Sequence, residues 1–542
     1  MKNNLSKRLM ALVLAGVMAL SLAACGGSGA ATGNSAKLDI ELEAGEVTYP
    51  LETEAQLSFW AGAQMQPSNA YSAWTESPFH TGLADKTGVD IDWKFLVAGG
   101  NAAQAYNLLW VDEEIPDMVY YTTTASDGLQ FIEDGLIWDI SEYLPDYAPN
   151  FWEYINRPEN AMEKNCITTD DGRFYKIPAV IENEYNATYM GFAIRQDWLE
   201  ECGLPMPVTL EDFENVLVTF NEKYDAKFGF RWHYAKKSGF IASAFDGLGF
   251  LDGFKVTDDQ KVVLPETCPE YEQLLATVAD WTDRGLFDED SITMDDSSVR
   301  TKALTGDIGV TIVPMSQLSL LISDAETEGN GANWVPMSYI RVAEGAPLSI
   351  TNTQAANVTN HGTLFTKSMS EDELKLALRW ADYAFTEEGI MFWNYGEEGV
   401  SYTLDAEGKP QFTELITSDP LGVSEALKRY AVTAGSAPTI QLASVVAGRN
   451  NAVTAEGPTI WTENSNARKH AIPPIGMTTE ENDIYTEKYA AIKTYMEEEV
   501  AKFVTCARPL DEYEDFVAEL YAMGLQDAID AYQAAYDRFL VK

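Results

Sequence analysis

The chain has 542 residues, and its 84 Asp and Glu against 37 Lys and Arg give a formal net charge of −47. Such a charge repels nucleic acid, anionic membranes and polyanionic glycans, so a neutral or cationic ligand is expected. The alternative is that the charge only keeps an exposed protein soluble. The length and the 46% hydrophobic content predict a globular protein with two cores.

Residues 1–24 have the features of a secretory signal peptide. Three basic residues in the first eight positions precede an apolar run at 10–22, which is shorter than the roughly 18 residues of a membrane span. Leu22-Ala23-Ala24-Cys25 then matches the bacterial lipobox and predicts cleavage before Cys25 and lipidation of that residue. The alternative is an ordinary signal peptide followed by an incidental cysteine.

Strand and helix patterns alternate after a segment, 25–56, that is rich in small and acidic residues and is predicted to be a flexible tether. This alternation predicts an α/β fold with mostly parallel strands. Strands are expected at 57–60, 89–93 and 115–119, and helices near 77–87, 101–110 and 128–134.

Residues 172–215 are predicted to form a strand, a polar link, a second strand, a short helix and a longer helix. Pro178 ends the first strand because it has no backbone donor, and Thr209 caps the last helix with Asp212. The sequences Gly-Arg-Phe-Tyr-Lys-Ile-Pro at 172–178, Arg-Gln-Asp-Trp at 195–198 and Gly-Leu-Pro-Met-Pro at 203–207 together resemble the inter-lobe crossover of extracellular solute-binding proteins of ABC importers. The most similar group is the large, lipidated, sugar-binding type related to maltose-binding protein.

The second half of the chain extends the resemblance. Gly-Asp-Ile-Gly at 306–309 precedes an apolar strand, an amphipathic helix with a Ser370 cap is predicted over 371–385, and a hairpin over 405–411. The segments 386–402 and 521–538 also resemble the large lipoprotein group. The resemblance implies a two-lobed periplasmic-binding-protein fold of type II, with hinge strands near 179–184 and 355–362 and extra C-terminal helices.

The expected division of the chain follows from this resemblance. It is a signal peptide at 1–24, a tether at 25–56, the first part of lobe 1 at 57–180, the first part of lobe 2 at 181–359, a return to lobe 1 at 360–400, and a mainly helical part at 401–542 that completes lobe 2.

Signatures of catalysis, metal binding and cofactor binding are absent from the sequence. It has no Gly-x-Ser-x-Gly, no His-Glu-x-x-His and no Walker loop, and its four histidines are scattered. Carboxylate pairs such as Glu397-Glu398 could serve a glycosidase, but 84 acidic residues produce such pairs by chance. The acidic run at 288–290 lacks the spacing of a calcium loop. No catalytic residue, metal or cofactor is therefore expected.

Four cysteines lie beyond the lipobox and lack the paired spacing of metal sites. Free thiols are the simpler interpretation, but the sequence does not choose among the three possible disulfide pairings. They are Cys166, Cys202, Cys268 and Cys506.

Aromatic residues at predicted strand ends are the best candidates for a ligand site, because α/β sheets bind ligands at the carboxyl ends of strands. Sugars present apolar C–H faces ringed by hydroxyl groups, which flat rings, amides and charged groups match. The candidate ligand residues are Trp60, Tyr120, Tyr121, Glu184, Tyr185, Trp232, Gln317, Trp334, Trp393, Tyr395 and Arg449.

The sequence therefore favours a monomeric substrate-binding protein of an ABC importer that takes up a neutral oligosaccharide. It would be anchored by Cys25 to the outer face of a bacterial cell membrane and deliver its ligand to permease subunits. Two alternatives remain: an extracellular glycan-degrading enzyme, and a sensor or adhesion lipoprotein on the same fold.

Overall fold

The computed structural model describes residues 38–62, 77–96, 100–112, 114–182, 188–420, 422–432 and 438–542. The chain divides into two units, Met1–Leu38 and Asp39–Lys542, and the second unit holds every helix and strand discussed below. The predicted signal peptide and Cys25 lie outside the described residues.

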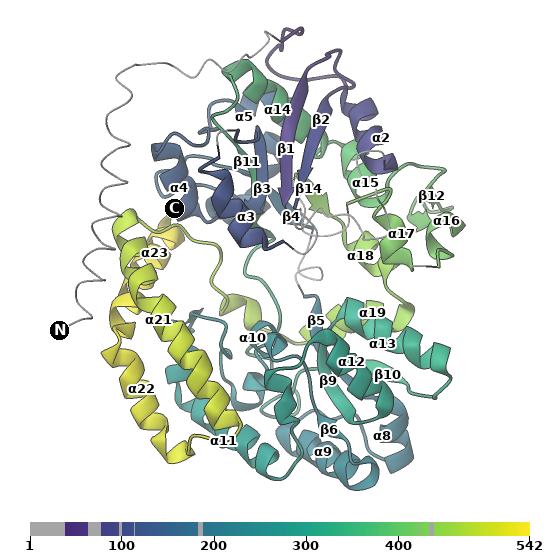
Figure 1. Cartoon of the computed structure of the whole chain (residues 1–542), viewed down its shortest axis with the longest axis vertical. Coiled ribbons are helices and arrows are strands. Elements are labelled where there is room, and N and C mark those ends of the chain that lie inside the picture. The colour runs from purple at the N-terminus through teal and green to yellow at the C-terminus, as the bar shows by residue number, and fades with distance from the viewer. Residues whose placement is uncertain are drawn as a thin grey trace, which may run out of the picture. The chain divides into compact units, whose positions relative to one another are not determined.

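The first lobe is built on a six-stranded sheet with the order β14-β4-β11-β3-β1-β2 (Figure 1). Strand β1 runs parallel to β2 and β3, whereas β11 runs antiparallel to β3 and β4. The strands are β1 (Gln56–Gly62), β2 (Asp90–Phe95), β3 (Met118–Thr122), β4 (Ile177–Ile181), β11 (Val358–Phe365) and β14 (Thr439–Gln441). The helices of this part are α2 (Pro78–Thr87), α3 (Ala102–Leu109), α4 (Ala125–Glu133), α5 (Leu144–Tyr147), α6 (Pro149–Ile155), α7 (Ala161–Cys166), α14 (Glu371–Tyr383) and α15 (Glu387–Tyr395).

The second lobe is built on a four-stranded sheet with the order β10-β5-β9-β6. Strand β5 runs antiparallel to both β9 and β10, while β6 runs parallel to β9. The strands are β5 (Met190–Arg195), β6 (Lys227–Phe228), β9 (Ile308–Pro314) and β10 (Trp334–Met337). The helices are α8 (Gln196–Cys202), α9 (Leu210–Tyr224), α10 (His233–Ser238), α11 (Pro269–Asp283), α12 (Asp296–Thr305) and α13 (Met315–Glu328).

The α/β class and the two-lobed organisation are confirmed, but the two sheets are mixed rather than mostly parallel. The difference arises because β5 and β11, which are the first strands after a crossing between the sheets, run antiparallel to their neighbours. The predicted helix ends at Ser370 and Gly203 are confirmed. Ser370 and Glu373 form a capping box at α14, and Gly203 ends α8 with φ of 66°. The predicted hairpin is formed by β12 (Tyr402–Leu404) and β13 (Pro410–Phe412).

The chain crosses between the sheets three times in the described part. The first crossing joins β4 to β5, the second joins β10 to β11, and the third leads from β14 towards α20 (Gly457–Thr462), which packs on β5 and β10. The expected division assigned residues 401–542 to the second lobe, whereas β14 pairs with β4 in the first sheet. A three-residue strand carries no periodic pattern, so it leaves no signal in the sequence. The remaining short helices are α16 (Glu414–Thr417), α17 (Val423–Leu427), α18 (Ala443–Arg449) and α19 (Ala452–Ala455).

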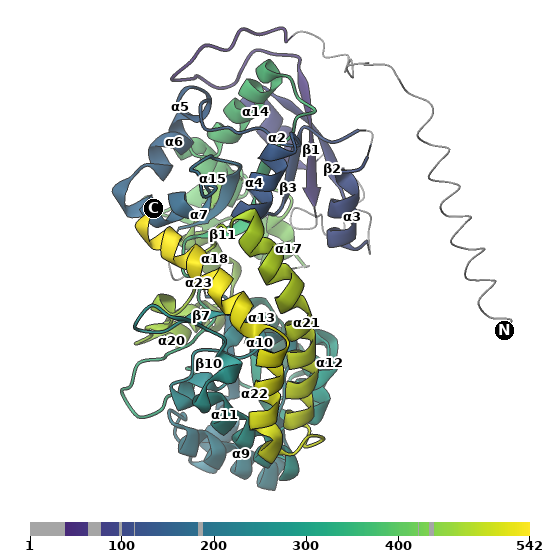
Figure 2. The same cartoon turned by 90° about the vertical axis from the view of Figure 1, so that its left-hand side faces the viewer.

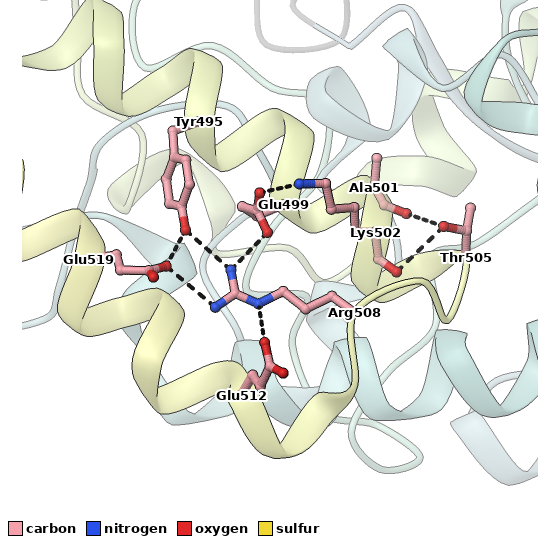
Figure 3. Close-up of polar contacts among 8 residues, drawn as sticks. All are labelled: Tyr495, Glu499, Ala501, Lys502, Thr505, Arg508, Glu512 and Glu519. Carbon is pink, nitrogen blue, oxygen red and sulfur yellow. Dashed lines mark hydrogen bonds and ion pairs between the residues drawn. The ribbon is translucent and has the colours of Figure 1, made fainter.

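Three C-terminal helices lie against the second lobe: α21 (Thr479–Val504), α22 (Tyr513–Ala522) and α23 (Leu525–Val541). Figure 2 shows α21 and α23 side by side, and their apolar residues belong to the same core as those of the second lobe. At the turn after α21, Arg508 contacts Glu499 at 2.8 Å and Glu512 at 3.2 Å (Figure 3). These ion pairs and the shared core hold the helices together.

The end of the C-terminal hairpin reaches the first lobe. Arg538 contacts Asp170 at 2.8 Å and Glu481 at 2.5 Å, so one guanidinium joins α23 both to the first lobe and to α21. The Lys542 ammonium donates to the carbonyls of Thr168 at 3.2 Å and Thr169 at 2.6 Å. The C-terminal helices therefore contact both lobes.

The last part of the predicted tether is held against the first lobe. Arg379 of α14, which is buried, donates to the carbonyls of Gly45 at 2.7 Å and Glu43 at 2.6 Å. The Tyr49 hydroxyl donates to the Arg379 carbonyl at 2.6 Å, and its ring meets the edge of Tyr383. Residues 43–49, which the sequence assigned to the tether, are thus bound to α14.

A buried lysine ties together three strands of the first sheet. The Lys176 ammonium, directly before β4, donates to the carbonyl of Thr123 at 3.0 Å and to that of Asn360 at 2.8 Å. The side chain is fully buried, and burial lowers the pKa of Lys176 to about 7. Gly362 makes room for it, since a Cβ there would lie 2.6 Å from the Lys176 Cδ.

Strand β5 contains a glycine because a tryptophan covers it. Trp461 of α20 is buried and donates from Nε1 to the Phe192 carbonyl at 3.0 Å. A Cβ at Gly191 would lie 2.5 Å from the Trp461 ring. The close approach fixes α20 on the second sheet.

Gly191→Ala is expected to destabilise the protein by about 2 kcal/mol, because the added methyl group overpacks this contact. Urea denaturation measures the effect. In a Trp461→Leu background the same substitution should cost much less, since the two residues are in direct contact. Equal costs in both backgrounds would show that the ring is not the obstacle.

Lys176 predicts a pH dependence of stability. Its folded pKa, about 7, lies below the ordinary value of 10.5, so the folded state binds fewer protons between these values. The contribution of Lys176 to stability therefore rises with pH from about 7 to about 10, by at most about 1.4 kcal/mol per pH unit. Lys176→Met should lose this slope, as measured by urea denaturation from pH 6 to pH 9.

The control is Lys409→Met, because Lys409 is an exposed side chain in the β12–β13 hairpin. Its stability curve should run parallel to that of the parent. If the Lys176→Met curve also runs parallel to the parent, the buried amine stays charged throughout this range, and the prediction is wrong.

Candidate functional site

A cleft of about 880 Å³ is lined by residues from both lobes and from the crossing segments. On the first lobe it meets the last residues of β3 and β4, Thr122 and Ile181, and the start of β11. On the second lobe it meets Pro314, where β9 ends, and the first residues of α13. Carboxyl ends of strands from both sheets therefore face one cleft, as is usual for ligand sites in α/β folds.

The predicted hinge segments form part of this lining. Ile181 ends the first hinge strand, and Ala355, Val358 and Asn360 belong to the second. The two segments are directly bonded, since the Ile181 amide donates to the Asn357 carbonyl at 2.7 Å. A movement at these segments would change the width of the cleft.

The aromatic part of the lining comes from the second lobe and the C-terminal helices. Tyr189, just before β5, is 39% exposed and lines the cleft. Phe254, Tyr485 and Tyr532 form an aromatic group at the same cleft, with the Phe254 and Tyr532 ring centroids 5.1 Å apart. An exposed ring such as that of Tyr189 can stack on the apolar face of a ligand.

Polar groups of several kinds line the rest of the cleft. Among them are amides and hydroxyl groups, which can donate and accept hydrogen bonds in the same place. They include Gln354, Asn360, Gln441, Asn450, Thr122, Ser316, Thr353 and Ser424.

Charged groups in the lining are mainly basic. Lys237, Lys255 and Arg449 stand against a single described carboxylate, Asp252, which contacts Lys255 at 3.0 Å. Burial lowers the pKa of Arg449 to about 10. The pKa of His361 is also lowered, first by burial and then by the nearby Lys176 charge.

Of the residues proposed from the sequence, Arg449 lies in the cleft lining. Six aromatic candidates are core residues with at most 8% of their surface exposed, and a ring buried among protein atoms cannot offer a face to a ligand. Tyr121 stacks on Tyr106 at 4.0 Å, and Gln317 lines a separate small cavity with Tyr234. Glu184 and Tyr185 lie outside the described residues. The core residues are Trp60, Tyr120, Trp232, Trp334, Trp393 and Tyr395.

Strand direction explains part of this outcome. Trp334 pairs with Arg195 and Met190 pairs with Pro314, so the cleft edge of the second sheet is where β9 ends and β5 begins. Trp334 lies at the opposite edge. Tyr189 precedes an antiparallel strand, and a search of carboxyl ends alone misses it. Lys237 lies on α10 and was not predicted, because its position in the sequence does not indicate that it faces a cleft.

Three further observations concern other kinds of site. Among the described residues, no group of three or more His, Cys, Asp or Glu side chains could hold a metal ion. In the same part of the chain, every helix is too short or too polar to cross a membrane. The four cysteines after the lipobox are free thiols, of which Cys166 is buried.

The chain is similar in sequence to curated bacterial proteins, among them the two that follow, although no family model matches it. It is 22% identical over 547 residues to the fructooligosaccharide ABC transporter substrate-binding protein FusA of Streptococcus pneumoniae, and the match covers 96% of each chain. It is 24% identical over 342 residues to the lipoprotein LipO of Bacillus subtilis, which covers 61% of this chain and 64% of LipO, less than two thirds of that relative.

Solved structures with the same fold cover nearly the whole chain. FusA in complex with kestose superposes with a TM-score of 0.69 at 20% identity, over 90% of this chain and 100% of FusA. The alginate-binding protein AlgQ2 gives 0.69 at 20% identity, over 89% of this chain and 98% of AlgQ2. The two-lobed fold and the resemblance seen in the sequence are thereby confirmed: the chain is a homologue of the solute-binding proteins of ABC importers.

Proposed function

We propose that this chain is the lipid-anchored extracellular substrate-binding protein of an ABC importer, and that it captures an oligosaccharide and delivers it to a permease. The observation that carries the proposal is the cleft of about 880 Å³ that both lobes and the hinge segments line. FusA, which is similar to this chain over 96% of its length, is a fructooligosaccharide-binding protein of such an importer.

The cleft has the properties that a sugar requires. Its volume lies in the usual range for ligand pockets, roughly 300–1,000 Å³. It combines an exposed ring, Tyr189, with amides and hydroxyl groups such as those of Gln354, Asn360 and Ser316. A ring matches the C–H face of a pyranose or furanose, and the polar groups match its hydroxyls.

Closure of the lobes would turn binding into a signal for transport. A ligand that contacts both sides of the cleft stabilises the closed form by the difference between its affinities for the closed and open forms. Hinge motion of this kind needs only a few residues that change their backbone angles. We expect the predicted hinge strands near 179–184 and 355–362 to supply them. The permease would then recognise the closed form.

The enzyme alternative has little support in the cleft. Glycoside hydrolysis ordinarily requires two carboxyl groups that flank the bond to be broken. Asp252 is the one carboxylate in the described lining, and Lys255 neutralises it at 3.0 Å. A sensor or adhesion role would use the same cleft, and a transport assay separates it from the importer.

Oligosaccharides are expected to raise the melting temperature of the protein, because they bind the folded state only. Tyr189→Ala should weaken this binding by roughly tenfold or more, since stacking and burial of one aromatic ring contribute about 1–3 kcal/mol. Isothermal titration with a panel of neutral and acidic trisaccharides measures the affinity.

The matched control for Tyr189→Ala is Tyr521→Ala, because Tyr521 of α22 is similarly exposed, at 43%, and is not among the residues lining the cleft. This variant should bind as the parent does. If amino acids or peptides stabilise the protein and no saccharide does, the proposed ligand class is wrong. Equal binding by both variants would remove Tyr189 from the site.

Cys25→Ala should release the protein from the membrane, because the lipobox at 22–25 is proposed to direct lipidation to this residue. Fractionation of cells that express the variant, followed by immunoblotting, measures the distribution. Cys506→Ala is the control, since Cys506 is a free exposed thiol outside the lipobox, and that variant should stay with the membrane. Membrane retention of the Cys25 variant would contradict the anchor.

A further inference from the structure

One segment of the cleft lining has an unusual backbone. The four consecutive residues 252–255 line the cleft, and Asp252 is exposed there. The residue before them, Leu251, has a φ of 56°, and Gly253 follows with a φ of 82°. A residue with a Cβ atom is uncommon in this left-handed region, because its side chain crowds the backbone. Such a conformation persists where the surrounding structure holds it in place.

The carboxyl end of the segment is held by backbone hydrogen bonds. Strand β7 (Lys255–Val256) pairs antiparallel with β8 (Val262–Val263). The Val256 amide also donates to the His470 carbonyl at 3.0 Å. Leu251 lies outside this pair of strands, so its buried amide needs another partner.

That partner is the side chain of Glu266. Its Oε1 atom accepts a hydrogen bond from the Leu251 amide. Glu266 is fully buried, and burial raises its pKa to about 7, because the ionised form is costly to place away from water. Among the described residues, the second carboxyl oxygen, Oε2, has no hydrogen-bond partner. The bond to Leu251 is therefore a reason for a carboxyl at this buried position.

The C-terminal helices fix both Glu266 and the segment that it holds. The Tyr513 hydroxyl of α22 donates to the Glu266 carbonyl at 2.9 Å. Phe254 of the segment packs on Tyr489 of α21, with the ring centroids 4.9 Å apart. The segment thus lies between a buried carboxyl at its amino end and an aromatic contact near its carboxyl end.

We propose that Glu266 is a positioning residue of the ligand site: its carboxyl holds the Leu251 amide and so fixes the backbone that presents residues 252–255 to the ligand. The inference rests on the proposed function, since it concerns the same cleft. Glu266 is not among the residues lining the cleft, so it acts through the segment. Without this carboxyl the Leu251 amide would be buried and unpaired, and a ligand would have to order the segment as it binds.

Amide hydrogen exchange of the full chain, measured by mass spectrometry on peptides that cover 249–256, tests the contact without a ligand. In the parent these amides should exchange slowly. Glu266→Met removes the acceptor and keeps the length of the side chain, so exchange should become about tenfold faster or more, while peptides from β9 exchange as in the parent. Glu266→Gln keeps an oxygen acceptor and should exchange slowly.

Glu266→Asp is a second, milder variant. Its shorter side chain draws the oxygen away from the Leu251 amide and keeps the carboxyl, so it should also speed exchange at 249–256. It takes the place of Glu266→Met if that variant does not fold, which a thermal melt decides.

The matched control is Asp382→Leu. Asp382 is also a buried carboxyl whose pKa is raised by burial, to about 6, and it accepts a hydrogen bond from the Phe151 amide at 2.8 Å. Neither Asp382 nor Phe151 is among the residues lining the cleft. Asp382→Leu should lose stability in urea, as Glu266→Met does, and leave exchange at 249–256 unchanged.

Isothermal titration with kestose, maltotriose and trigalacturonate measures the effect on the site. Glu266→Met and Glu266→Asp should each bind the saccharide that the parent binds about tenfold more weakly, which corresponds to one lost buried hydrogen bond. Glu266→Gln and Asp382→Leu should bind it as the parent does.

The outcomes distinguish this inference from the proposed function. If a saccharide binds the parent and Glu266→Met equally well, or if Asp382→Leu loses as much affinity as Glu266→Met, the proposed function stands and the inference is overturned. Fast exchange at 249–256 in the parent, or unchanged exchange in the Glu266 variants, overturns it as well. If no saccharide binds the parent, the proposed function fails, and exchange alone decides whether Glu266 holds the segment.

Discussion

The buried ammonium of Lys176 organises the side of the first sheet that faces the cleft. It donates to the carbonyl of Thr123, which follows β3, and to the carbonyl of Asn360, which lies in β11. Lys176 itself directly precedes β4. The last residues of β3 and β4 and the first of β11 are those that line the cleft. A group that is costly to bury is thus placed where three strands have to keep their relative positions. Burial lowers the pKa of His361 in the lining, and the Lys176 charge lowers it further, so Lys176 also contributes to the electrostatics of the cleft.

The connections between the lobes are more numerous than a simple hinge requires. Besides the three crossings, Arg538 and Lys542 at the end of α23 contact Asp170 and the backbone of the first lobe. The remainder of the C-terminal hairpin shares the core of the second lobe. Any rotation of one lobe against the other has to preserve or exchange these contacts. Tyr485 and Tyr532 of the same helices line the cleft, so the hairpin also takes part in the site.

The sequence predicted the architecture better than the site, and particular residues show why. Caps and glycine positions, such as Ser370 at α14 and Gly203 after α8, are local and held in the structure. The three-residue strand β14 and the direction of β5 depend on pairing with distant segments, which no local pattern records. Whether a tryptophan lies in a core or in a cleft depends on the same distant contacts. Arg449, proposed from the sequence as a candidate for contacts with ligand hydroxyl groups, lies in the cleft lining.

The contact between α14 and the residues before β1 has a mechanical consequence. Arg379 holds the backbone at Glu43 and Gly45, and Tyr49 bonds back to Arg379. A force applied to the chain from its N-terminal side therefore acts on these contacts with α14 before it acts on any strand of the first sheet. None of the residues that make these contacts, Glu43, Gly45, Tyr49 and Arg379, lines the cleft. Load applied from the N-terminal side would therefore enter the first lobe at α14, away from the cleft.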